Sequence, residues 1–242
     1  MLILAIETAT QSVGVALANE HGVVAHLEVR QGRRHAETVV PAVEQLLAHA
    51  EASMAAITRI AVDVGPGLFT GLRVGVATAK AYALALDVPV VAISSLELVA
   101  YEVAPILVSR ASVSSFVEGV TVSDAQVFRF GTVIDARRKE FYAAVFEASL
   151  VDGQIICKQT IPTFVAKPLD VRELFSSAGV SVVAGDGAMV YPGTFDDFAI
   201  VAASPRASIL SERALIVEGT SADEIELDYV RAPDAEINWV TR

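Results

Sequence analysis

Residues 2–17 read LILAIETATQSVGVAL, and this stretch decides the fold. An apolar, β-branched run ends in Glu7, a five-residue polar turn follows, and a second apolar run begins at Val13. Short apolar runs bounded by turn residues predict two strands. The same order recurs at residues 133–145, VIDARRKEFYAAV, where Asp135 takes the place of Glu7. The recurrence predicts two related lobes that face one another, with chance similarity between strand–turn–strand units as the alternative.

A second pair of stretches repeats in the same way: residues 62–67 read VDVGPG and residues 182–187 read VVAGDG. Hydrophobic periodicity over the first 105 residues predicts the order β-β-β-α-β-α-β-α. This order, duplicated, is the arrangement of actin and the sugar kinases. We therefore predict an α/β, two-lobed, actin-like (ASKHA, ribonuclease H-like) fold, with mixed sheets flanked by helices and a reduced second lobe.

The predicted division of the chain follows the repeat. Residues 1–105 form the N-terminal lobe, residues 106–219 the reduced C-terminal lobe, and residues 220–242 a tail. The last helix of the second lobe, about residues 205–219, is predicted to pack either on its own lobe or back on the first lobe. Residues 108–126 are rich in Ser, Val and Gly without a clear period, which predicts a loop or linker insert.

Composition narrows the class of protein. Eighteen Lys and Arg against 29 Asp and Glu give a net charge of −11, which disfavours binding to phosphate backbones and anionic lipid. A content of 53% hydrophobic and 19% charged residues excludes intrinsic disorder. The single cysteine, Cys157, excludes a disulfide framework and fits a reducing compartment. Charged residues interrupt every apolar run, so we expect no membrane helix, no signal peptide and a cytoplasmic protein.

The strongest local motif is GPGLFTG at residues 65–71, between a predicted strand and a predicted helix. Glycines there allow a tight turn, and the amides of a helix N-terminus attract anions. The alternative is an ordinary strand-to-helix turn. In the helix, Gly71, Gly75 and Ala79 form a smooth strip that allows another backbone to approach. We predict that Gly75→Leu disrupts association more than folding, with packing on the chain's own sheet as the alternative.

Two further features lie in the turns of the predicted hairpins. Residues 137–139, RRK, are the densest basic run of the acidic chain, and the repeat predicts that they face residues 7–12 across a cleft. A solvated hairpin tip is the alternative. Glu7 and Asp135 occupy matching positions, where they could hold a hydrated cation or cap their turns.

Hydrolytic constellations are missing from the sequence. The four histidines lack the spacing of metal ligands, and no Gly-x-Ser-x-Gly motif occurs. We therefore predict no catalytic residues and no metal site.

Several of these stretches together resemble one family. Residues 2–10 (LILAIETAT), 35–37 (HAE), 65–75 (GPGLFTGLRVG) and 229–231 (YVR) resemble motifs of the TsaB (YeaZ) family, a subunit of the bacterial machinery for threonylcarbamoyladenosine in tRNA. The resemblance is specific over residues 1–105 and looser beyond.

The resemblance implies a non-catalytic scaffold that pairs with the catalytic subunit TsaD through helices near residues 35–50 and 70–86. It further implies TsaE as a partner, a homodimer when alone, no tight contact with tRNA and no membrane contact. TsaD carries a metal-binding His-x-x-x-His where this chain has Ser95 and Val99. Departures from the family are Glu7, where Asp is usual, and Leu227, where proline is expected.

Two sets of site residues follow. Positions facing a nucleotide or phosphate are predicted at Glu7, Thr8, Thr10, Gly65, Gly67, Arg137 and Arg138. The partner interface is predicted at His35, Val39, Val43, Leu46, Gly71, Gly75 and Ala79. No cofactor is expected to bind tightly, and ATP or ADP at the partner interface stays open. The alternative function is an ATP-dependent kinase of the actin and sugar-kinase type, while the missing histidines argue against a metallopeptidase.

Overall fold

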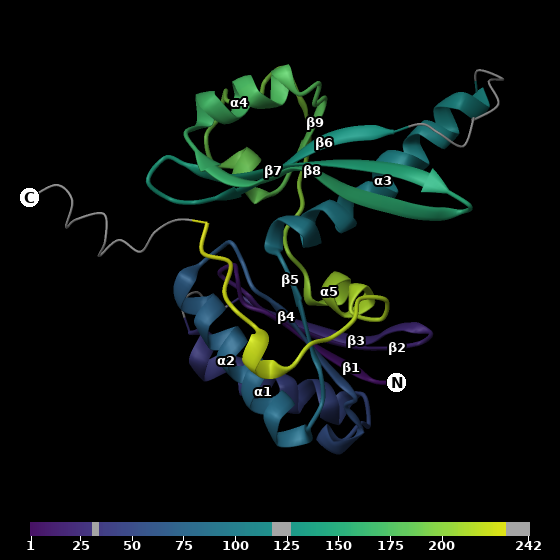
Figure 1. Cartoon of the computed structure of the whole chain (residues 1–242), viewed down its shortest axis with the longest axis vertical. Helices are drawn as coiled ribbons and strands as arrows, with labels where there is room; N and C mark the ends of the chain where they lie inside the picture. Colours follow the sequence, from purple (N-terminus) through teal and green to yellow (C-terminus); the bar gives the residue numbers. More distant parts are fainter. Residues whose placement is uncertain (31–33, 118–126, 231–242) are drawn as a thin grey trace, which may run out of the picture.

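Two five-stranded sheets form the framework of the chain, one in each lobe (Figure 1). The computed structural model describes residues 1–30, 34–117 and 127–230. The first sheet contains β1 (Ile3–Glu7), β2 (Val13–Asn19), β3 (Gly22–Val29), β4 (Arg59–Asp63) and β5 (Val90–Ile93). The second sheet contains β6 (Phe128–Asp135), β7 (Phe141–Val151), β8 (Gln154–Ala166), β9 (Val182–Ala184) and β10 (Ala199–Val201).

The two sheets have the same topology. The first has the order β3-β2-β1-β4-β5, and the second, read from its opposite edge, has the order β8-β7-β6-β9-β10. In each, the first three strands are antiparallel, and the fourth and fifth run parallel to the first. The duplication predicted from the sequence is therefore confirmed, and the fold is the two-lobed actin-like one.

The helices connect and cover these sheets. They are α1 (His35–His49), α2 (Phe69–Leu86), α3 (Ser95–Val117), α4 (Pro168–Ser177) and α5 (Ala207–Arg213), together with the short 3-10 helices η1 (Met54–Ala56), η2 (Asp186–Met189) and η3 (Ala222–Glu224). None of the helices within the described ranges is long and apolar enough to cross a bilayer.

Two helices are exchanged between the lobes. Helix α3 directly follows the last strand of the first sheet but packs against β6, β7 and β8 of the second. Helix α5 directly follows the second sheet but packs against β1, β2 and β3 of the first. The predicted boundary at residue 105 falls inside α3. The chain thus crosses between the lobes twice, once on entering α3 and once on the way to α5.

Helix α3 also corrects one prediction. Residues 108–117, predicted as part of a loop or insert, continue this helix, and the remainder of that insert lies outside the described residues. Hydrophobic periodicity is low along α3 because one of its faces covers the second sheet, while Leu98 near its start packs in the core of the first lobe.

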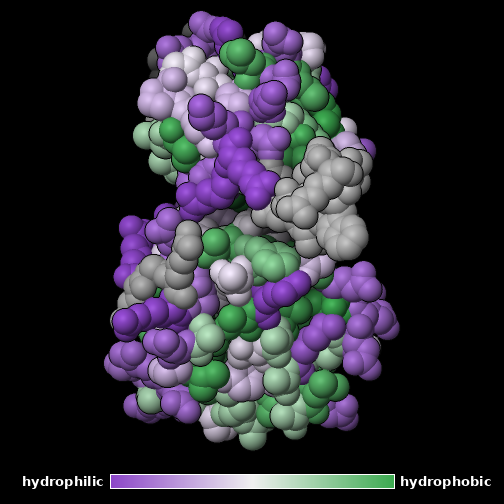
Figure 2. Space-filling model, turned by 90° about the vertical axis from the view of Figure 1, so that its left-hand side faces the viewer, coloured by the Kyte–Doolittle hydropathy of each residue, from purple (hydrophilic) through white to green (hydrophobic). Residues whose placement is uncertain are grey.

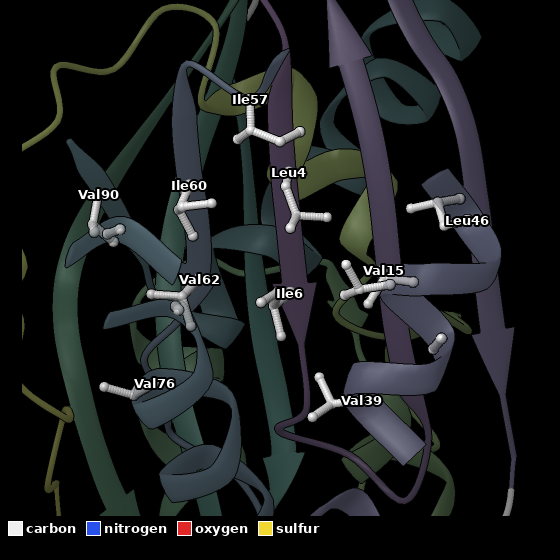
Figure 3. Packing of buried hydrophobic residues seen from close by; sticks show 14 of the residues in the cluster. Leu4, Ile6, Val15, Val39, Leu46, Ile57, Ile60, Val62, Val76 and Val90 are labelled. Atoms are coloured by element: carbon white, nitrogen blue, oxygen red, sulfur yellow. The ribbon is translucent and has the colours of Figure 1, made fainter. Parts of the chain in front are cut away.

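The central strand β1 shows why the first lobe needs helices on both faces. All five of its residues are buried. Leu4 and Ile6 point towards α1 and α2, where they meet Val39, Leu46 and Val76 (Figure 3). Alternate residues of a strand point to opposite faces, so Ile3 and Ala5 contact α5 on the other side.

The end of the described chain returns to the first lobe. We call residues 219–230 the C-terminal segment. It begins with a two-way backbone pairing between Thr220 and Val90, at 2.8 and 2.9 Å. Ala222 and Ile225 then enter the core of the first lobe. Figure 1 shows the segment, in yellow, passing across α2 towards the space between the lobes.

Candidate functional site: the cleft between the lobes

A cleft of about 1020 Å³ lies between the two lobes. The first lobe contributes the turn after β1, at residues 9–12, and the start of α2. The second lobe contributes the end of β6 and the turn that follows it, at residues 134–138. Figure 2 shows the waist between the lobes, where a hydrophilic area of the second lobe stands over a more hydrophobic area of the first.

The cleft brings together the two turns that the repeat related. Arg137 and Arg138 line it together with residues 9–12, as predicted for the basic run. Lys139 is not among the lining residues. A structural duplication with facing lobes places equivalent turns in equivalent positions, which is why the sequence repeat alone could predict this arrangement.

The second-lobe turn is tightly held. Asp135 Oδ1 accepts a hydrogen bond from the Arg137 amide at 2.9 Å, and Arg137 Nη1 lies 3.2 Å from Asp135 Oδ2. Tyr191 donates its hydroxyl proton to the same carboxylate, at 3.3 Å. Arg137, Arg138 and Lys139 have φ values of +62°, +52° and +60°, a left-handed conformation that non-glycine residues rarely adopt. The turn therefore presents its arginines from a constrained backbone.

Seven residues were predicted to face a nucleotide or phosphate, and the structure places some of them in the cleft and others outside it. Five line the cleft: Glu7, Thr10, Gly67, Arg137 and Arg138. Thr8 and Gly65 do not line it, and for these two the prediction is wrong. Thr8 is fully buried because its side chain turns away from the cleft and packs against Gly71 and Gly75 of α2. Gly65 lies next to the side chain of Leu72, before the residues of its loop that reach the cleft.

Two buried carboxyl groups lie side by side at this end of the first sheet, and of the two only Glu7 lines the cleft. Glu7 and Asp63 end the neighbouring parallel strands β1 and β4 and are 2% and 0% exposed. Glu7 Oε1 accepts a hydrogen bond from the Ala9 amide at 2.6 Å. The hydroxyl of Ser95 donates to Asp63, 2.7 Å from Oδ1 and 2.9 Å from Oδ2, and the Gly65 amide donates to Oδ1 at 2.8 Å.

Burial controls the protonation of this pair. Loss of solvation raises the pKa of Asp63 to about 7, although the hydrogen bonds from Ser95 and Gly65 oppose the shift. Loss of solvation, and next the neighbouring charge of Asp63, raise the pKa of Glu7 well above its usual value. Two carboxyl groups so close together in a dry site retain a proton at pH values where exposed carboxylates are ionised.

The set of residues predicted as the partner interface lies inside the first lobe. His35, Val39, Val43 and Leu46 are at most 3% exposed, and Ala79 is fully buried. Gly71 and Gly75 are buried too. The assignment is wrong for these side chains, because α1 and α2 turn their small and apolar faces to the sheet and to each other.

The glycine strip has a specific neighbour within the chain. A Cβ at Gly75 would stand 2.2 Å from Thr8 Oγ1, and one at Gly71 would stand 2.1 Å from the Thr8 carbonyl oxygen. His35 Nε2 donates to the Thr10 carbonyl oxygen at 2.9 Å. The strip therefore serves close packing of α2 on the turn that lines the cleft, which favours the alternative that Gly75→Leu disrupts folding rather than association.

Two features in and beside the cleft were missed from the sequence. One is the buried bond between Asp63 and Ser95 next to Glu7, which polar residues after two buried strands could have indicated. The other is the wall formed by residues 227–230, which the YVR motif marked without placing it. Within the described parts of the chain, no group of three or more His, Cys, Asp or Glu side chains could hold a metal ion.

Comparison with known proteins places the chain in a family. Residues 16–163 match the family model described as TsaD, tRNA N6-adenosine threonylcarbamoyltransferase. A Bacillus subtilis relative, the tRNA threonylcarbamoyladenosine biosynthesis protein TsaB, is 28% identical over 99% of this chain and 98% of its own length. The Escherichia coli protein of the same name is 40% identical over 40% of this chain and 41% of its own length.

A solved structure supports the same family. The structure of YeaZ from Pseudomonas aeruginosa superposes with a TM-score of 0.70 at 27% identity, covering 94% of this chain and 99% of that one. The family model spans more than half of the sequence, and the similarity to TsaB and YeaZ runs along nearly all of it. The chain therefore belongs to this family of tRNA N6-adenosine threonylcarbamoyltransferase proteins, in its TsaB (YeaZ) branch.

Proposed function

We propose that this chain takes part in the biosynthesis of threonylcarbamoyladenosine in tRNA, as a cytoplasmic subunit without a catalytic centre of its own. The observation that carries the proposal is the similarity to a TsaB protein over 99% of the chain. In the complex, the threonylcarbamoyl group passes to N6 of the adenosine next to the anticodon. A TsaD-type subunit supplies the catalytic residues, and TsaE is a further partner.

The positions where TsaD carries its histidines support the non-catalytic role. Ser95 is fully buried and donates its hydroxyl proton to Asp63. Val99 is fully buried and packs in the core of the second lobe. Both side chains are part of the chain's own packing, and neither offers a nitrogen ligand to a metal.

The partner surface is better sought on the outer faces of the same two helices. Val40 on α1 is 41% exposed and Leu84 on α2 is 64% exposed, although both belong to helices whose inner faces are buried. Apolar side chains that remain in solvent on adjacent helices are suited to an interface with a second protein. We propose that these outer faces bind TsaD, and bind a second copy of the chain when TsaD is absent.

We expect Val40→Glu and Leu84→Glu to weaken association without weakening the fold, because each adds a charge to an exposed apolar site. The measurement is mass by light scattering, alone and with the TsaD subunit, beside the thermal midpoint. Ile216→Glu is the matched control, since Ile216 is 71% exposed elsewhere on the molecule. Unchanged masses for both helix variants would contradict this surface.

The activity itself is tested with purified components. We expect the chain alone, with zinc or iron added, to form no threonylcarbamoyladenosine, and co-purification from its own cell lysate to recover a TsaD-type subunit. Metal-dependent turnover by the chain alone, abolished by a chelator, would overturn the non-catalytic assignment.

A second candidate is an ATP-dependent kinase, which the cleft between two actin-like lobes favours. We propose instead that no nucleotide binds tightly to the chain alone, and that ATP or ADP occupies the cleft within the complex, with phosphates near Thr10, Gly67 and the arginines of the second-lobe turn. Calorimetric titration of ATP into the isolated chain separates the two: tight stoichiometric binding favours the kinase.

A further inference from the structure

The C-terminal segment forms one wall of the cleft. Leu227, Asp228, Tyr229 and Val230 all line it, although they lie more than 200 residues from the β1 turn that lines the opposite side. Of these four residues, only Leu227 also packs against the core of the first lobe, where it is half-buried. Without the four residues, the mouth of the cleft would lose this wall.

The segment is attached unevenly along its length. Its first part is fixed by the pairing of Thr220 with Val90 and by the side chains of Ala222 and Ile225, each 5% exposed. Its last part is attached by the half-buried side chain of Leu227, by the Asp228 amide, which donates to the Val64 carbonyl oxygen at 2.9 Å, and by the ring of Tyr229. Segments with few buried apolar contacts open at a lower free-energy cost than the core.

The attachment of Tyr229 is an aromatic contact at the start of α2. Its ring centroid lies 5.8 Å from that of Phe69, with the planes tilted by 48°. The guanidinium carbon of Arg73 lies 3.9 Å from the Phe69 ring centroid, on which it stacks. Phe69 and Tyr229 remain 42% and 52% exposed, so the contact excludes little water and its loss costs little.

The backbone next to Tyr229 also lies close to the loop that precedes α2. The Asp228 carbonyl oxygen would be 3.5 Å from a Cβ on Gly65. Three residues after Gly65, the amide of Leu68 donates to the carbonyl oxygen of Ala9 at 2.6 Å, in the turn that carries Thr10. A shift of residues 226–230 therefore changes the access of solvent and reagents to this turn.

We propose that residues 226–230 are a movable wall of the cleft, held closed by the contact of Tyr229 with Phe69, and that release of this contact opens the cleft mouth. The hinge is the stretch after Ile225, the last buried anchor of the segment.

The test measures access to the cleft without any ligand, so its result is independent of the proposed function. In a Cys157→Ser background, Thr10→Cys places a thiol in the cleft, and the rate of its reaction with a maleimide is followed. Ala48→Cys, on the exposed face of α1, gives the reference rate for an open site.

We expect Tyr229→Ala to raise the labelling rate at position 10 roughly two- to tenfold, the factor that the loss of one aromatic pair produces in an equilibrium between closed and open forms. The rate at position 48 and the thermal midpoint should stay the same, and Tyr229→Phe, which keeps the ring, should label at the wild-type rate. An unchanged rate at position 10 would contradict the proposal that the contact of Tyr229 with Phe69 holds the wall closed. So would a rise at both positions with a lower midpoint, because the effect would then be general loosening.

Discussion

Gly75→Leu is expected to unfold the first lobe or to lower its free energy of unfolding by about 3 kcal/mol or more, which is the upper range for overpacking of a core. A Cβ at this position would stand 2.2 Å from Thr8 Oγ1, a distance that no pair of such atoms tolerates. Because Gly75 and Thr8 are both buried, an isobutyl group has no space into which it can turn. Urea denaturation followed by circular dichroism measures the loss.

The steric cause can be isolated with a smaller pair of changes. Gly75→Ala gains about 1 kcal/mol in helix propensity, yet we expect it to destabilise because its methyl group meets the Thr8 hydroxyl. Thr8→Ala removes that hydroxyl. The double variant should therefore be more stable than Gly75→Ala alone, and a double-mutant cycle gives the coupling between the two sites.

Ala77→Leu is the control, because Ala77 lies on the exposed face of the same helix. We expect its free energy of unfolding to remain within about 0.5 kcal/mol of wild type. A Gly75→Leu protein that keeps its stability but loses its partner would restore the strip to the interface and contradict the packing described above.

The second large effect is a loss of stability with rising pH. Both Glu7 and Asp63 have a pKa that is higher in the folded chain than in the unfolded chain. Below about pH 4 both states hold these protons, and the full stability is present. Between about pH 4 and pH 7 the unfolded chain has lost them while the folded chain retains them. The free energy of unfolding should therefore fall by about 1.4 kcal/mol per pH unit for each retained proton.

Asp63→Asn should remove the part of this dependence that comes from Asp63 and reduce the part that comes from Glu7, whose pKa remains raised by burial. The amide keeps an oxygen for the Gly65 amide proton and a nitrogen that can donate to the Ser95 hydroxyl, and it has no charge to bury. We expect the variant to be more stable than wild type at pH 8 and to show a flatter profile between pH 5 and pH 7. Urea titrations at each pH provide the measurement.

Asp223→Asn controls for the change in net charge, since Asp223 is exposed on the C-terminal segment. Its profile should follow that of the wild type. A wild-type protein whose stability rises from pH 5 to pH 7 would show that the two buried carboxyl groups are ionised in the fold.

The sequence predicted the strands and their duplication well, because these depend on local patterns. Short apolar runs and matching turns at Glu7 and Asp135 sufficed to predict two equivalent sheets and a cleft between their turns. The assignment of faces failed for α1 and α2. Val39, Val43 and Leu46 recur at helical spacing whether the helix packs on its own sheet or on another protein, and periodicity cannot distinguish the two.

Long-range contacts account for the remaining errors. Thr8 was expected in the cleft because it follows Glu7 in the turn, yet its orientation depends on Gly75, 67 positions later in the chain. The wall formed by Tyr229 depends on Phe69 at a still larger separation. No local pattern encodes such pairings, so the cleft could be predicted in outline but its walls could not.

The exchange of α3 and α5 has a consequence for how the protein forms during synthesis. Ile3, Ala5 and Ala16 are made about 190 residues before the helix that covers them through Ala207 and Leu210. Until α5 is made, that face of the first sheet is covered by Leu98 at the start of α3 but not by Ala207 and Leu210. The rest of α3 packs on strands that are made after it. We therefore expect neither half of the chain to fold by itself. A chain split between the lobes should regain structure only when both fragments are present.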